Sequence, residues 1–206
     1  VKDQELKNYP ECIFIVGMPR SGSTLLESIL SINNVDDLGE KDILEKSFLN
    51  WKASPEKSTL AELYLNQINY YSSELRTTTN KYLYNYQYAG IISNQIPNAK
   101  IIHCFRNPLD NILSIYRANF ARGNEYSSSL IARNPSQEIK SLISWLGWKW
   151  DDQYLSPHLN PRSVYTASAV QVRSPINSQS IGGWKNYKEM LRPAMEIITQ
   201  NNKYQD

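Results

Sequence analysis

Residues 17–24, GMPRSGST, have the composition and spacing of a loop that binds phosphate. Gly17 and Gly22 are separated by four residues, an apolar run precedes them, and an amphipathic run, LLESIL, follows. In such a loop successive backbone N–H groups turn toward one anion, and the following helix adds the positive end of its dipole. Arg20 supplies a cation within the loop. We therefore predict an anion site here.

The loop differs from that of an ATPase or GTPase at one position. Ser23 follows the second glycine where those enzymes have a lysine that reaches the γ-phosphate. The substitution indicates a phosphate-bearing donor whose transferable group is not a γ-phosphoryl. The chain also has no evident metal-binding aspartate at the end of a predicted strand. Both features disfavour a P-loop kinase or NTPase.

A second candidate site follows the apolar run AKIIHCF (99–105). Its length and β-branched content predict a buried parallel strand. Asn107 and Pro108 have the residue types of an N-cap and a first helical turn, so Arg106 lies at the carboxyl end of the strand. Ligands bind at that end of open α/β sheets. Ser114 lies off the apolar stripe of the following helix and can face a ligand.

Other segments supply the elements that must position these residues. The triplet at 77–79 is β-branched and predicts a short strand. Apolar periodicity predicts three helices. The first runs from Pro55 to about Leu75 with Ser54 as its N-cap, the second covers 82–95, and the third runs from Pro135 to Gly147. Residues 148–184 have little periodicity and many turn formers, and loops of that length are usually functional.

Composition limits the classes of protein to which the chain can belong. Its 206 residues, 41% of them hydrophobic, suit one soluble domain, and a net charge of +2 gives no support for nucleic-acid binding. No apolar run is long enough to span a membrane. Cys12 and Cys104 predict free thiols in a reducing, cytoplasmic compartment. No His, Cys, Asp and Glu cluster has zinc spacing, so we predict no metal.

The two motifs, in this order, resemble a known family. GMPRSGSTLLESIL is similar to the 5′-phosphosulfate loop of sulfotransferases, and RNPLDNILSIYRANF to their 3′-phosphate motif. VQVRSPINSQSIGGWKNY near the C-terminus also matches. The chain resembles the bacterial sulfotransferases that often follow tetratricopeptide repeats and, more distantly, tyrosylprotein sulfotransferases. The resemblance covers about residues 11–200.

The resemblance implies a fold, a reaction and a set of partners. The fold is a P-loop-type parallel β-sheet flanked by helices, in a single domain over residues 1–206. The reaction is transfer of a sulfuryl group from 3′-phosphoadenosine 5′-phosphosulfate (PAPS) to an acceptor hydroxyl by in-line displacement, without a metal. The partners are this nucleotide donor and a hydroxyl acceptor. The resemblance also leaves room for an N-terminal repeat domain that precedes this chain.

The family's functional residues can be transferred by position. The catalytic lysine matches Lys81, which would stabilise charge on the departing phosphate oxygen, and the general base matches Glu40, with Asp42 as the next candidate. The family's glutamate tends to fall one position later, at Lys41, which cannot act as a base while charged. Tyr126 takes the family's tyrosine position at the donor. The other residues expected to bind the donor's phosphates are Arg20, Ser21, Gly22, Ser23, Thr24, Arg106 and Ser114.

The sequence departs from the family between Gly123 and Tyr126. There the family usually has a few dozen more residues, including a core strand. If those residues are absent from the natural protein, the sheet lacks a strand and activity is in doubt. A catalytically impaired module that binds PAPS or its product, 3′-phosphoadenosine 5′-phosphate (PAP), is therefore the alternative to an active sulfotransferase.

Overall fold

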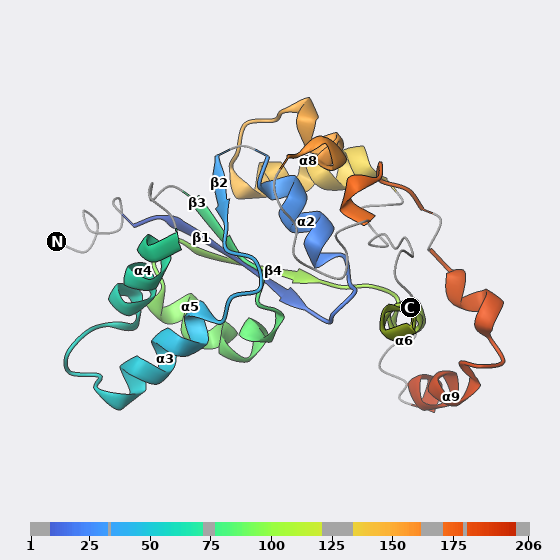
Figure 1. The fold of residues 1–206 in the computed structure, drawn as a ribbon, viewed down its shortest axis with the longest axis horizontal. Helices are drawn as coiled ribbons and strands as arrows, with labels where there is room; N and C mark the ends of the chain where they lie inside the picture. The colour runs from blue at the N-terminus through green and yellow to red at the C-terminus, as the bar shows by residue number, and fades with distance from the viewer. Residues whose placement is uncertain are drawn as a thin grey trace. The chain divides into compact units, whose positions relative to one another are not determined.

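The computed structural model describes residues 9–32, 34–71, 77–120, 134–161, 171–178 and 181–200 (Figure 1). The chain forms two compact units. The first contains Val1–Gly17 and Leu26–Cys104, and the second contains Met18–Leu25 and Phe105–Asp206. The prediction of a single domain over 1–206 stays a prediction.

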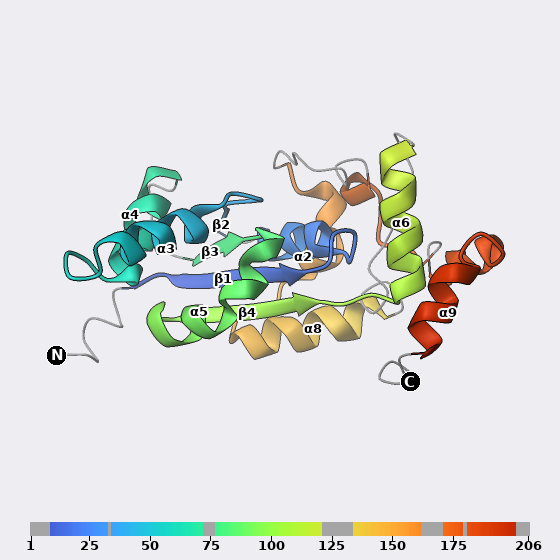
Figure 2. The ribbon, with the colours of Figure 1, turned by 90° about the horizontal axis from the view of Figure 1, so that it is seen from below.

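The first unit is built on a parallel sheet, as the sequence predicted. Its four described strands lie in the order β2-β3-β1-β4, and β1 pairs with both β3 and β4 (Figure 2). The strands are β1 (Glu11–Gly17), β2 (Val35–Asp37), β3 (Thr77–Asn80) and β4 (Ala99–Cys104). Because all pairs are parallel, the carboxyl ends of the strands lie at one edge of the sheet.

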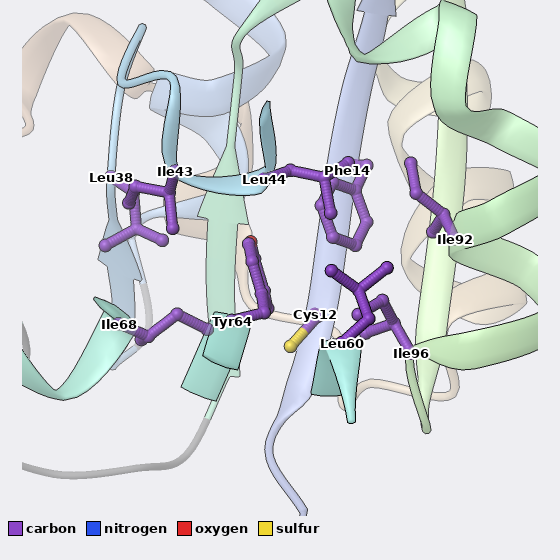
Figure 3. Close-up of a cluster of buried hydrophobic side chains, with 10 residues drawn as sticks. All are labelled: Cys12, Phe14, Leu38, Ile43, Leu44, Leu60, Tyr64, Ile68, Ile92 and Ile96. Atoms are coloured by element: carbon purple, nitrogen blue, oxygen red, sulfur yellow. The ribbon is translucent and has the colours of Figure 1, made fainter. Parts of the chain in front are cut away.

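One face of the sheet is covered by three helices whose apolar stripes meet β1. Cys12 and Phe14 of β1 belong to one buried cluster with residues of these helices, among them Tyr64, whose ring centroid is 5.4 Å from that of Phe14 (Figure 3). The helices are α3 (Ile43–Ala53), α4 (Leu60–Tyr71) and α5 (Ala89–Gln95), the last preceded by the 3-10 helix η1 (Leu83–Tyr88). This cluster is the core of the first unit.

The opposite face of the sheet meets helix α2 (Ser23–Leu30), which follows the loop. Thr79 of β3 is paired in register with Ile13 of β1, so their side chains share this face. The Thr79 hydroxyl lies 3.4 Å from Oε1 of the buried Glu27 in α2. The chain thus leaves β1 toward one face and β3 toward the other. In open α/β sheets, ligands bind at the carboxyl ends of strands whose connections diverge in this way.

Gly17 ends β1 where the backbone of β4 comes very close. A Cβ atom at this position would lie 2.3 Å from the carbonyl oxygen of Cys104, and the residue has φ +140°. Because the neighbouring atom is backbone, no side-chain movement can relieve the clash. The strand therefore requires glycine at the point where the loop begins.

We expect Gly17→Ala to lower the free energy of unfolding by at least about 1–3 kcal/mol, through backbone strain and the clash with Cys104. Gly90→Ala in α5 is the matched control, because a Cβ there meets nothing within 4 Å and alanine favours helix, so the change should be neutral or slightly stabilising. Chemical denaturation of both variants is the measurement. Equal stabilities would show that the close approach is not a constraint.

Two helix predictions for the first unit need correction, and one helix was not predicted. Ser54 does not begin a helix but ends α3, and α4 begins after Thr59, whose hydroxyl and backbone N–H exchange hydrogen bonds with Glu62 at 3.2 and 2.9 Å. This capping box outweighs the Ser54–Pro55 signal. The segment predicted as one helix over 82–95 is the 3-10 helix η1 followed by α5. Helix α3 was missed, because its apolar stripe is short.

Strand β4 is parallel, as predicted, but it is not fully buried. Its residues are half-buried, except His103, which is exposed. Within the described residues, β4 pairs with β1 and with no other strand.

The second unit is mainly helical in its described part. Asn107 caps α6 (Pro108–Phe120) as predicted, since its Oδ1 accepts hydrogen bonds from the N–H groups of Leu109 and Asp110 at 3.0 and 3.2 Å. Helix α8 (Pro135–Leu146) ends at Gly147 in the left-handed conformation, also as predicted. The C-terminal helix is α9 (Arg192–Gln200). In the described ranges, no helix is long and apolar enough to cross a membrane.

Candidate functional site

The predicted site residues follow directly after the carboxyl ends of three strands, β1, β3 and β4. From β1 the chain enters the loop at 18–22, from β3 it continues to Lys81, and from β4 it continues to Arg106 two residues later. Ligand-binding residues in parallel α/β sheets lie at this edge. The residues then fall into two clusters, one in each unit, and we describe these separately.

The first cluster is the phosphate loop with the beginning of α2. Arg20 and Gly22 both have positive φ, 69° and 101°. The N–H group of Ser21 donates to the carbonyl of Met18 at 3.3 Å, which closes a turn. Such alternating conformations turn successive N–H groups inward as an anion-binding nest.

Hydroxyl groups accumulate at the end of this loop. Ser21, Ser23 and Thr24 are all buried. Ser21 is 2% exposed, and its buried hydroxyl has no hydrogen-bond partner among the described residues. A buried hydroxyl without a partner is costly, and a bound anion would accept its hydrogen bond.

Arg106 and Ser114 of the second motif both contact Arg20. The Ser114 hydroxyl accepts a hydrogen bond from Nε of Arg20 at 3.2 Å, and Nη1 of Arg106 donates to the Arg20 carbonyl at 3.3 Å. Arg106 and Ser114 are buried, with 4% and 0% of their surface exposed. The structure therefore brings together the loop and the 3′-phosphate motif, which are far apart in the sequence. Two guanidinium groups held beside a loop of this geometry suit an anion with more than one phosphate.

Two further residues of α6 organise this cluster, and sequence reasoning missed both. Asn111 donates from Nδ2 to the Pro19 carbonyl at 3.0 Å. The buried carboxylate of Asp110 accepts from the N–H groups of Gly182 and Trp184 at 2.9 and 3.1 Å. Asp110 fixes the start of η5 (Gly183–Tyr187) to the same helix. The four-residue spacing of Asp110 and Ser114, which places them on one side of α6, was the available signal for Asp110.

The second cluster contains Glu40 and Lys81, which the structure brings into contact. Nζ of Lys81 lies 2.5 Å from Oε1 of Glu40. The Lys81 side chain is fully buried, whereas that of Glu40 is 51% exposed. A buried ammonium group needs a partner, and here the carboxylate supplies it. The glutamate can still reach solvent or a substrate.

The two alternatives to Glu40 have other contacts. Lys41 donates to the Leu38 carbonyl at 3.1 Å and lies 4.7 Å from the ring centroid of Tyr71. Asp42 pairs with Lys46 at 2.8 Å. Neither of these contacts involves Lys81. Of these three residues, Glu40 is the one whose described side-chain contact is with Lys81.

Cys104 lies near this cluster without a role in it. Both cysteines are free thiols, as predicted. Burial raises the pKa of Cys104 to about 12, although the positive charge of Lys81 opposes the shift. Burial likewise raises the pKa of Cys12 to about 12. Neither thiol is a reactive nucleophile at neutral pH.

Two predictions have no structural test at all. Tyr126, assigned to the donor, and the junction at 123–126 lie outside the described residues.

For metals, no group of three or more His, Cys, Asp and Glu side chains that could hold an ion occurs in the described part of the chain.

Comparison with known proteins finds sulfotransferases among those similar to this chain. The sulfotransferase family model matches residues 41–132. An uncharacterized protein of Aquifex aeolicus is 28% identical over 93% of this chain, which spans 32% of that protein's length. A Caenorhabditis briggsae protein with the provisional name protein-tyrosine sulfotransferase is 24% identical over 87% of this chain and 82% of its own length.

A solved structure has the same fold. The sulfotransferase domain from the curacin biosynthetic pathway matches with a TM-score of 0.53, over 85% of this chain and 90% of that chain, at 16% sequence identity. Its likeness supports the parallel α/β architecture. The family model and the Caenorhabditis relative make this chain similar to sulfotransferases.

The sequence alignments also bear on the shortened segment. The alignment with the Aquifex protein extends over 247 residues, whereas 93% of this 206-residue chain is about 192 residues. The Caenorhabditis alignment extends over 234 residues, whereas 87% of this chain is about 179. Each alignment thus exceeds the matched part of this chain by about 55 positions. The relatives therefore have additional residues within the matched range, and the alignment lengths do not locate them along the chain.

Proposed function

We propose that this protein is a sulfotransferase that uses PAPS as donor and a hydroxyl compound as acceptor. The observation that carries the proposal is the contact of Arg106 and Ser114 with Arg20. This contact joins a phosphate loop without the NTPase lysine to a second pair of phosphate-binding side chains. A donor with phosphates at two positions of its ribose needs both. Similarity to the sulfotransferase family supports the transfer reaction.

In the proposed reaction, the sulfur atom moves between two oxygens. The bond between sulfur and the 5′-phosphate oxygen breaks, the bond to the acceptor oxygen forms, and PAP leaves with the electron pair. Arg20, Ser21, Gly22, Ser23, Thr24, Arg106 and Ser114 would bind the donor's phosphates. Lys81 would stabilise the charge on the departing oxygen, and Glu40 would take the acceptor's proton. Positioning and charge stabilisation dominate such in-line transfers.

Incubation with ³⁵S-labelled PAPS and a panel of phenolic, carbohydrate and peptide acceptors tests this proposal. We expect label in at least one acceptor and release of PAP. PAP binding without transfer to any acceptor would favour the alternative, a catalytically impaired binding module. The additional residues of the relatives support that alternative, because their absence from this chain could have removed part of the transfer machinery.

A divalent ion should not be required. Ser23 occupies the position of the NTPase lysine, and the proposed step does not use a bridging metal. We expect PAP affinity and sulfuryl transfer to be unchanged by EDTA, as measured by calorimetry and label transfer. Loss of PAP affinity with chelator, together with magnesium-dependent ATP binding, would favour the P-loop kinase class instead.

The proposal also includes the location and organisation of the protein. The two free thiols support a reducing, cytoplasmic compartment. We retain the single-domain organisation and an N-terminal repeat domain as expectations.

A further inference from the structure

The segment that carries Glu40 is attached to the end of β3 by the side chain of Asn80. Nδ2 of Asn80 donates to the carbonyl of Gly39 at 3.3 Å and to that of Lys41 at 3.0 Å. These carbonyls belong to the residues on either side of Glu40. One amide group therefore fixes both ends of the residue that carries the carboxylate.

A second buried amide orients the first. Oδ1 of Asn80 accepts a hydrogen bond from Nδ2 of Asn85 in η1 at 2.6 Å. Asn80 and Asn85 are 1% and 0% exposed. With its oxygen engaged by Asn85, the Asn80 amide must direct its N–H groups toward Gly39 and Lys41. The Asn80 amide has partners at both its oxygen and its nitrogen, so a rotated Asn80 amide would leave polar groups unpaired, whereas Oδ1 of Asn85 has no partner among the described residues.

The same corner holds Lys81, the next residue in the chain. Its backbone N–H donates to the Gly39 carbonyl at 2.9 Å, while its ammonium group contacts Glu40. The Glu40 side chain is half-exposed, so the packing of neighbouring residues around it does little to fix the carboxylate. Its position relative to Lys81 depends on the backbone at Gly39–Lys41.

We propose that Asn80 is a positioning residue for sulfuryl transfer and that Asn85 orients it. The two amides hold the Glu40 carboxylate and the Lys81 ammonium in one fixed arrangement. This inference rests on the proposed function, because the roles of Glu40 and Lys81 belong to it. A displacement of about 1 Å in a reacting group can cost roughly 100-fold in rate, so loss of this arrangement should be visible in turnover.

The test replaces the amides by an apolar side chain of similar volume. Asn80→Leu removes both contacts to the Glu40 segment but leaves the Asn85 amide unpaired. The double variant Asn80→Leu/Asn85→Leu removes both partners of the hydrogen bond, which is usually far less destabilising than the removal of one partner. It is the variant to use if Asn80→Leu alone does not fold. Asn94→Leu is the matched control, because Asn94 is an exposed amide whose hydrogen bond in the described part of the chain is to the Gly90 carbonyl of its own helix.

We expect the folded Asn80 variants to lose roughly 10- to 100-fold in kcat, while KM for PAPS and PAP affinity stay within about twofold. The control should keep wild-type values. A wild-type kcat in folded variants, or a parallel loss of kcat and PAP affinity, would overturn the inference. A wild-type chain without any transfer would contradict the proposed function instead.

Hydrogen exchange tests the arrangement independently of activity. The Lys81 amide, which donates to Gly39, should exchange faster in the Asn80 variants than in the wild type, while Phe14 in β1 keeps its protection. Unchanged exchange at Lys81 would show that Asn80 does not hold this segment, and would overturn the inference even if no acceptor is found.

Discussion

Replacement of Lys81 by alanine, or of Glu40 by glutamine, should lower the rate of sulfuryl transfer by roughly two orders of magnitude or more. Lys81 is the buried cation that would stabilise the departing oxygen, and Glu40 is the carboxylate in contact with it. Removal of a charge-stabilising or acid–base group has this scale of effect. Glutamine keeps the size of Glu40 but cannot take the acceptor's proton.

A second ion pair in the same sheet provides the matched control. Nζ of Lys100 lies 2.6 Å from Oε1 of Glu11, and both side chains are partly buried. Lys100→Ala and Glu11→Gln repeat the two substitutions at a pair with no proposed role in transfer, and both should retain turnover. Label transfer from PAPS under single-turnover conditions is the measurement. Full activity of Glu40→Gln would remove Glu40 as the base and make Asp42 the next carboxylate to test.

The second large effect is expected in nucleotide binding. Wild-type protein should bind PAP much more tightly than adenosine 5′-monophosphate, and Arg106→Ala should remove most of that difference. A charge-assisted hydrogen bond to phosphate is worth about 1.5–3 kcal/mol, which corresponds to roughly 10- to 150-fold in affinity. Arg106→Lys should recover only part of the preference, because an ammonium group lacks the planar fork of a guanidinium.

Calorimetry with the two nucleotides is the measurement, and Arg192→Ala is the control. Arg192 is an exposed arginine whose side chain is 70% accessible. Equal affinity of the wild-type protein for PAP and adenosine 5′-monophosphate would refute the assignment of Arg106 and Ser114 to a 3′-phosphate. Arg20→Ala should lower the affinity for both nucleotides, since the loop is expected to bind the 5′-phosphate that they share.

The sequence predicts those parts of the molecule that local interactions determine. The turn at 17–24 and the Asn107 cap depend on residues within a few positions, and the cap is confirmed. The Ser54 prediction was wrong because two local signals competed. Thr59 has a partner, Glu62, that completes a capping box, whereas no described side-chain bond caps a helix at Ser54.

The contacts that hold the site residues could not be predicted in the same way. Asn80 meets Gly39 and Lys41, and Asn111 meets Pro19, across long separations in the sequence. Their residue types are common in turns and caps, so nothing local distinguishes them. Resemblance to the family supplied Glu40 and Lys81 as candidates, but only the fold shows that the two side chains touch.

The half-buried strand β4 also matters for how the protein behaves at high concentration. Among the described strands it has a neighbour on one side only, and edge strands of this kind can pair with strands of other molecules. Lys100 lies on this strand, and charged residues, lysine above all, oppose such pairing. The Lys100→Ala control should therefore self-associate more readily than Glu11→Gln, which leaves that lysine in place. Light scattering across a series of protein concentrations would reveal the difference. The kinetic comparisons should therefore be made at low protein concentration.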